Sequence, residues 1–98
     1  MDFCVYKQLI KRADNDIIVA NSTEYLTAVF NFSQDWKGYI KTAIFTHSSG
    51  SIAIKLNEND EITADNNLSL LAGSYVVSVV GIKGDSKIIT NIVPLTVQ

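Results

Sequence analysis

The sequence predicts an all-β protein, an antiparallel β-sandwich of about seven short strands. Apolar residues recur at every second position in several segments, which is the spacing of strands with one face on a core. Turn-forming residues, mainly Gly, Asn, Asp and Ser, separate these segments at short intervals. No segment has the three- and four-residue spacing of a long helix. At most, residues 68–72 could make one helical turn.

The size and composition of the chain exclude several classes of protein. It has 98 residues, 47% hydrophobic and 18% charged, so we expect one globular domain spanning residues 1–98. The formal net charge is -2 and the basic residues are scattered along the sequence, whereas nucleic-acid binding requires clustered cations. No apolar run approaches the roughly 20 residues that cross a bilayer, and no signal peptide is recognisable. We therefore expect synthesis in a cytoplasm, with no nucleic acid and no membrane as partner.

The first quarter of the chain predicts two strands separated by polar loops. Residues 3–10 alternate and predict the first strand. Residues 11–16 are polar and rich in turn formers, so they predict a loop. Residues 17–19 are β-branched and predict a short second strand, which a turn at residues 21–23 ends.

The stretch from Tyr25 to His47 organises the predicted core. One face of the first strand in this stretch carries Leu26, Ala28, Phe30 and Phe32. Residues 39–47 predict the next strand, and Trp36 lies in the crossing between the two. Its indole can close one end of a two-layer core, contributing ~1.5–3 kcal/mol by burial. Alternatively it can face a partner, because tryptophan is enriched at interfaces.

The second half predicts three more strands, at residues 51–56, 75–82 and 87–98. Hairpin turns are expected at residues 48–51 and 83–86, and an exposed loop at residues 57–61. Pro94 has no N–H to donate, which predicts a position at a sheet edge or a bulge.

The segment from Leu71 to Val79 has the pattern of the corner before the penultimate strand of immunoglobulin-like domains. In that corner a tyrosine hydroxyl bonds to nearby backbone. Tyr75 can take this part, or it can be an ordinary strand aromatic. Cys4 is the only cysteine, so the usual disulfide of antibody domains is missing. The sequence thus predicts an immunoglobulin-like sandwich without a disulfide.

Residues for catalysis, cofactor binding or metal binding do not form any recognisable set. His47, the only histidine, is followed by serines, but adjacency in sequence does not supply a base held by a buried acid. Cys4 has no basic neighbour to activate it. Together these two residues are too few for a zinc site. The loop at residues 57–61 resembles a fragment of a calcium loop, yet it lacks the central glycine and the final carboxylate. We expect a protein that is not an enzyme and holds no cofactor and no metal.

Five motifs follow one another between Phe30 and Val97. They are Phe30-x-Phe32, Trp36-x-Gly38, Lys41-Thr42-Ala43-Ile44-Phe45, Gly73-x-Tyr75-Val76-x-Ser78-Val79-x-Gly81 and Thr90-Asn91-x-Val93. In this order and spacing they resemble a family of small β-sandwich modules in the virions of phages of Gram-positive bacteria. Members of that family are N-terminal domains of upper baseplate proteins, bases of head fibres, and capsid decoration proteins.

The resemblance implies a structural virion protein that docks on a larger assembly. The implied partner is the major capsid protein or another virion protein, bound in many copies by virion symmetry. Baseplate members continue into long coiled or receptor-binding regions, whereas this sequence stops at Gln98. The expectation is therefore an accessory decoration or head-fibre-base protein on the capsid, with a tail or baseplate adapter as the alternative.

The candidate docking residues lie near the N-terminus and in the crossing before residue 40. They are Tyr6, Trp36, Lys37 and Tyr39. A further alternative is a carbohydrate- or surface-binding immunoglobulin-like domain, which needs exposed aromatic residues on one face. Trp36 and Tyr39 are the only candidate pair for that role.

Overall fold

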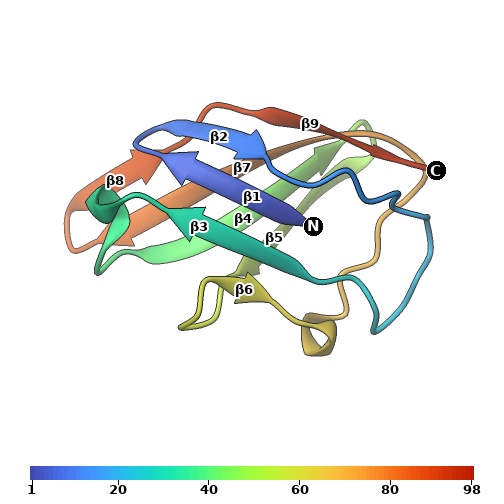
Figure 1. Ribbon diagram of the computed structural model, residues 1–98, viewed down its shortest axis with the longest axis horizontal. Coiled ribbons are helices and arrows are strands. Elements are labelled where there is room, and N and C mark those ends of the chain that lie inside the picture. Colours follow the sequence, from blue (N-terminus) through green and yellow to red (C-terminus); the bar gives the residue numbers. More distant parts are fainter.

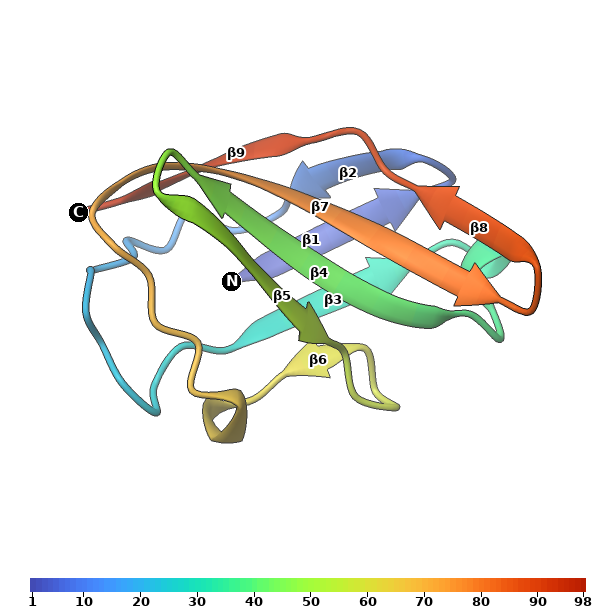
Figure 2. The ribbon, with the colours of Figure 1, turned by 180° about the vertical axis from the view of Figure 1, so that it is seen from behind.

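The computed structural model describes residues 1–98 as two β-sheets packed face to face (Figure 1). The elements are β1 (Asp2–Tyr6), β2 (Leu9–Arg12), β3 (Ala28–Phe32), η1 (Gln34–Trp36), β4 (Ile40–His47), β5 (Gly50–Lys55), β6 (Glu61–Ile62), η2 (Ala64–Asn66), β7 (Gly73–Lys83), β8 (Ser86–Ile89) and β9 (Val93–Val97). One sheet has the order β2-β1-β3-β6. The other has the order β5-β4-β7-β8, and β9 also pairs with β7 (Figure 2). The predicted all-β sandwich is confirmed.

The central strands follow the order of an immunoglobulin-like sandwich, and β2 and β8 are added to it. The series β9-β7-β4-β5 matches the sheet that carries the last strands of such domains, and β3 pairs with β6 in the facing sheet. The strand pairs are antiparallel as expected, except that β1 runs parallel to β3. Parallel neighbours need a long connection, and β2 with the loop at residues 13–27 provides it.

The predicted strand at residues 3–10 is wrong, because the chain turns back at Lys7 and Gln8 and forms the β1–β2 hairpin. Lys7 adopts a left-handed conformation with φ of 55°. Its N–H donates a hydrogen bond of 2.9 Å to Oγ of Ser33. A side chain from the β3–β4 crossing therefore fixes this turn, which raises the number of strands above the expected seven.

Three more expectations change for local reasons. The segment at residues 17–19 is not a strand, since Ile18 makes only a single parallel bridge with Val97. The last predicted strand divides into β8 and β9 because Asn91 leaves the sheet, its N–H donating to the carbonyl of Gln8 at 2.9 Å. The helical turns occur at η1 and η2, and residues 68–72 are not helical.

The core is a cluster of 20 buried hydrophobic residues between the two sheets. The alternation expected around Tyr25–His47 is confirmed, with Leu26, Ala28, Phe30, Ala43 and Phe45 all buried. Five aromatic rings form a continuous row along the core, with centroids 4.9 to 6.4 Å apart, in the order Phe3, Phe30, Phe32, Trp36 and Tyr39. Rings at these separations stabilise one another beyond their burial.

Tyr75 forms the predicted corner, so the alternative of an ordinary strand aromatic is wrong. It is buried at the start of β7, and its hydroxyl accepts a hydrogen bond of 2.8 Å from the N–H of Leu71. The ring of His47 packs 4.7 Å from the tyrosine ring. The corner thereby links the start of β7 to the end of β4. Pro94 also lies as predicted, in β9 at a sheet edge.

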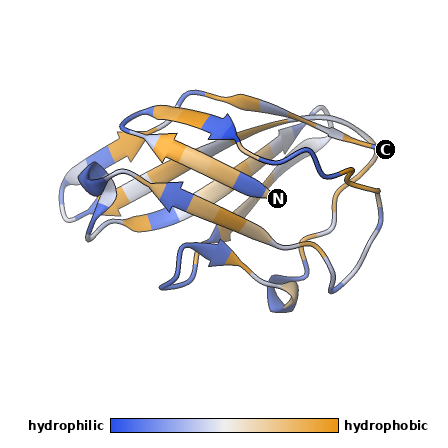
Figure 3. Cartoon of the chain, in the orientation of Figure 1, coloured by the Kyte–Doolittle hydropathy of each residue, from blue (hydrophilic) through white to orange (hydrophobic).

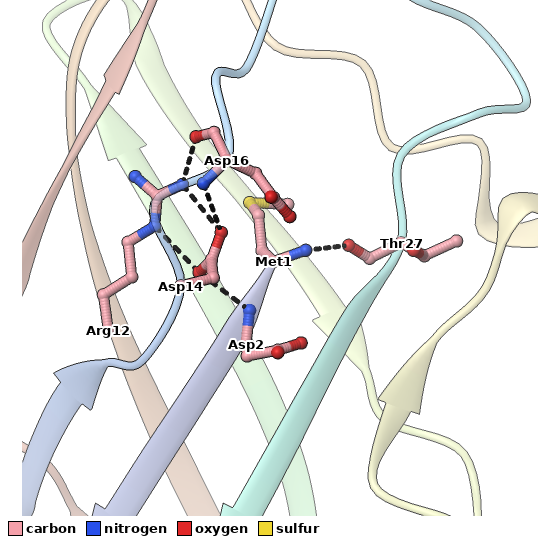
Figure 4. A network of polar contacts seen from close by, with 6 residues as sticks. All are labelled: Met1, Asp2, Arg12, Asp14, Asp16 and Thr27. Carbon is pink, nitrogen blue, oxygen red and sulfur yellow. Dashed lines mark hydrogen bonds and ion pairs between the residues drawn. The ribbon is translucent and has the colours of Figure 1, made fainter.

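A polar network around Asp14 holds the loop that follows β2 against the start of β1 (Figure 4). Asp14 accepts two hydrogen bonds of 2.9 Å from Arg12, and one each from the N–H groups of Asp2 and Asp16. The bonds from Arg12, followed by those from the two N–H groups, hold the pKa of Asp14 well below its ordinary value, although desolvation opposes them. The ionised carboxylate is therefore the form that the fold stabilises.

Replacing Asp14 with asparagine should lower the free energy of unfolding at neutral pH by about 1–3 kcal/mol, because the amide cannot satisfy four donors. The pKa of Asp14 is lowered on folding, so its contribution is present above the ordinary aspartate pKa of about 3.9. It is lost as the pH falls below that value. Urea unfolding at neutral and acidic pH should show the gap between Asp14→Asn and wild type narrowing in acid. Asp16→Asn, which removes a more exposed carboxylate, is the control, and an equal gap at both pH values would contradict the assignment.

Candidate functional site

Trp36 is part of the core, the first of the two expectations for it, and the alternative that it faces a partner as a docking residue is wrong. Its side chain is 0% exposed. The indole Nε1 donates a hydrogen bond of 2.7 Å to the carbonyl of Lys7. A Cβ atom at Gly81 of β7 would lie only 2.7 Å from Cζ3 of the ring. The indole is therefore packed closely against the backbone of β7 and is inaccessible to a partner.

This burial also removes the aromatic pair on which sugar binding would depend. Tyr39 is only half-buried, but its ring lies edge-on to the indole at 6.4 Å. The amino group of Lys83 lies 5.8 Å from the centre of the Tyr39 ring. A sugar stacks on an open aromatic face, and Trp36 does not offer one.

The other three predicted docking residues lie at one end of the sandwich, around the buried indole. Tyr6 ends β1 beside the β1–β2 turn and is 63% exposed. Lys37 and Tyr39 follow η1 in the β3–β4 crossing, and Lys37 is exposed. The β7–β8 turn completes this end, as the ribbon shows on the side opposite the C-terminus (Figure 1). The β1–β2 turn, the β3–β4 crossing and the β7–β8 turn are far apart in the sequence, so no local pattern indicates that they meet.

Four lysines gather at this end of the molecule. They are Lys7, Lys37, Lys83 and Lys87, half of the eight basic residues. Only two of the ten carboxylates, Asp35 and Asp85, occupy the same turns, so this end has a formal charge of +2 and the rest of the chain -4. A hollow of about 350 Å³ between the turns is lined by Lys7, Gln8, Asp35, Lys87 and Ile88. Half of the basic residues, although scattered along the sequence, therefore lie at one end of the molecule.

Next to the lysines, the outer face of the larger sheet exposes isoleucines from three adjacent strands. Ile40 of β4, Ile82 of β7 and Ile89 of β8 are 56%, 42% and 45% exposed. Ile40 pairs with Ile82, which pairs in turn with Lys87, and Ile89 pairs with Val80. Hydropathy colouring shows apolar strand ends beside the hydrophilic η1 (Figure 3). Lys87 lies beside Ile82 on this face, whereas Tyr39 and Lys83, which alternate with Ile40 and Ile82, lie toward the core side at the end of the sheet. We call the outer face around Ile40, Ile82, Ile89 and Lys87, together with the adjoining end that carries Lys37, Tyr39 and Lys83, the lysine-rimmed patch.

The distribution of carboxylates marks the borders of the lysine-rimmed patch. The outward positions of β4, β5, β7, β8 and β9 carry no carboxylate. Beyond Tyr39, a hollow of about 280 Å³ contains Glu58 and Asp60, and Asp60 forms a 3.0 Å ion pair with Lys41. Sequence reasoning missed the three isoleucines because an outward isoleucine and a core isoleucine both fit the composition of a strand.

The residues considered for chemistry lie elsewhere. His47 is held between Ser49 and Ala72: its Nδ1 lies 2.9 Å from Oγ of Ser49, and its Nε2 lies 3.2 Å from the carbonyl of Ala72. Because a carbonyl can only accept, Nε2 is the protonated nitrogen. Cys4 is exposed on the outer face of the smaller sheet. No group of three or more His, Cys, Asp or Glu residues could hold a metal ion. Neither helical turn could span a bilayer.

Adding a methyl group at Gly81 should disturb the organisation of this end. Gly81→Ala should lower the free energy of unfolding by about 1–3 kcal/mol, since the new Cβ meets the rigid indole. Urea unfolding of wild type, Gly81→Ala, Trp36→Phe and the double variant measures the effect as a double-mutant cycle. The smaller phenyl ring should relieve the clash, so Gly81→Ala should cost less in the Trp36→Phe background. If Gly81→Ala lowered the free energy of unfolding equally in both backgrounds, the indole would not be the group with which the new Cβ clashes.

The structure gives this chain one surface that combines exposed apolar side chains with a cluster of like charges. The three isoleucines and the lysines around them are the features from which a function can be inferred. No protein-family model, curated protein or solved structure matches the chain.

Proposed function

We propose that this chain is a non-enzymatic structural module of a phage virion, an accessory decoration or head-fibre-base protein that docks on the capsid surface. The single observation that carries the proposal is the lysine-rimmed patch, where apolar side chains from three strands are exposed beside clustered cations. Two of the docking residues predicted from the sequence, Lys37 and Tyr39, belong to it. The resemblance of the motifs to small β-sandwich virion modules supplies the biological setting.

The composition of the patch is that of a protein–protein contact. Stable interfaces place apolar residues at the centre and charged residues at the rim, and contiguous exposed apolar side chains on a small protein commonly mark such a contact. Ile40, Ile82 and Ile89 form the apolar part, Lys87 borders it on the same face, and Lys37 and Lys83 border it at the end of the sheet. The complementary partner is an apolar protein surface bordered by carboxylates, because opposite charges steer and orient docking.

The patch is also rigid, which favours binding. Its isoleucines lie on hydrogen-bonded strands, and its loop residues follow a buried tryptophan that is bonded to the neighbouring turn. A surface that is ordered before binding loses less conformational entropy when a partner docks. The module would therefore bind without a folding step of its own.

A charge reversal within the patch tests the docking surface. Lys87→Glu should weaken binding to heads from which the protein has been stripped by mild denaturant, by roughly tenfold or about 1.4 kcal/mol. Higher salt should weaken wild-type binding, since exposed charges are screened. Lys11→Glu makes the same change on the outer face of the opposite sheet and should bind like wild type. Equal loss in both variants, with unchanged melting temperatures, would exclude the patch as the docking surface.

Fractionation of virions tests the location. Heads and tails of the phage that encodes this chain can be separated on a density gradient, and the chain detected by mass spectrometry. We expect it in the head fraction. Its occurrence only with tails would replace the capsid role with that of a tail or baseplate adapter, and its absence from both fractions would contradict a virion protein.

A further inference from the structure

One edge of the larger sheet is open. β5 pairs only with β4, and Figure 2 shows it as the outermost strand of its sheet. In an antiparallel pair, residues alternate between those that exchange both backbone hydrogen bonds and those that exchange none. The N–H of Leu56 donates to the carbonyl of Lys41 at 2.9 Å. Leu56 is therefore a hydrogen-bonded position, and the alternation continues along the register of β4 and β5. The N–H and C=O groups of Ser51, Ala53 and Lys55 accordingly point away from β4.

Every other sheet edge is too short to pair with a further strand, contains a proline, or is already hydrogen-bonded to another part of the chain. β6 has two residues. β2 donates from the N–H of Ile10 to Oδ1 of Asn91 at 2.9 Å. β8 has four residues and accepts a bond from the side chain of Gln8 at the carbonyl of Ile89. β9 contains Pro94, and Gln98, directly after the strand, exchanges backbone bonds with Ile18 and Ala20. β5 has six residues, no proline and one charge, so it lacks most of the devices that protect an edge.

We propose that the β5 edge pairs antiparallel with the β5 edge of a second copy of this chain, joining the two larger sheets into one continuous sheet. The proposal does not depend on the virion role, because it concerns the purified chain alone. With Ala53 opposite Ala53 of the second copy, Ser51 lies opposite Lys55. The backbone N–H and C=O groups of all three residues are then hydrogen-bonded to the second copy. This register satisfies more backbone groups than one shifted by two residues.

The side chains of β5 suit a second copy. Ile52 and Ile54 are half-buried and face the core side of the sheet. In the proposed register Ile52 lies opposite Ile54 of the second copy, and such apolar cross-strand pairs stabilise a sheet. On the outer face, the small Ala53 lies at the two-fold axis. The only charge of the strand, Lys55, faces a serine, so no like charges oppose each other.

Disulfide capture tests the register directly. Directly opposed, hydrogen-bonded residues have Cα atoms about 5.5 Å apart, within the range that a disulfide spans. In a Cys4→Ser background, Ala53→Cys should form a covalent dimer rapidly under mild oxidation. Ser78→Cys, on the outer face of the central strand β7, should remain monomeric. Equal cross-linking of the two variants would overturn the proposal.

Sedimentation of the chain without introduced cysteines gives the second readout. A single strand edge buries less area than the ~1,200–2,000 Å² of stable interfaces, so we expect a reversible dimer whose fraction rises with concentration. Ala53→Pro removes an N–H that β4 does not use, and should weaken dimerisation roughly tenfold or more. Ala53→Lys should do the same by opposing like charges, whereas Ser78→Lys should not. A wild type that stays monomeric at all concentrations, or a dimer that both Ala53 variants leave unchanged, would overturn the proposal.

Discussion

The contact between the Trp36 indole and the bare backbone of Gly81 is the constraint on which one end of this sandwich depends. The ring is fully buried, and no side-chain atom of Gly81 separates it from β7. Its only polar atom is satisfied by the carbonyl of Lys7, so burial leaves no unpaired donor. One side chain thereby joins the β1–β2 turn, the β3–β4 crossing and β7. The other rings of the aromatic row continue this contact toward the middle of the core.

The same arrangement explains why the exposed residues at this end are ordered. Tyr39 packs against the indole, and the amino group of Lys83 lies over the Tyr39 ring. Lys83 and Tyr39 therefore rest on the rigid core around the indole. A net positive end on an acidic protein also gives the molecule a charge asymmetry, which orients it in the field of a charged partner before contact.

How much the sequence could predict follows from the range of each interaction. Alternation along a strand is local, and it correctly identified the buried faces around Phe30 and Phe45. The turn at Lys7 depends on Ser33, which is 26 residues away, and no local pattern reports such a contact. The parallel pairing of β1 with β3 depends in the same way on where the long loop returns. Trp36 remained ambiguous in the sequence because tryptophan serves cores and interfaces equally well, and only the position of Gly81 decides between them. The patch isoleucines were missed for a related reason: strand composition does not distinguish the two faces of a sheet.

The polar ties of Asn91 have a consequence for how the chain reaches its folded state. Its side chain and backbone bond the β1–β2 hairpin to the segment between β8 and β9, across sequence separations of about 80 residues. A contact of such long range closes a large loop of the chain. The conformational entropy of that loop is lost before the contact contributes any bond, which slows folding. The N-terminal hairpin acquires its final neighbours only after the last strands have emerged from the ribosome. Closure of the sandwich is therefore a late step of folding, and until then the hairpin edge stays unpaired.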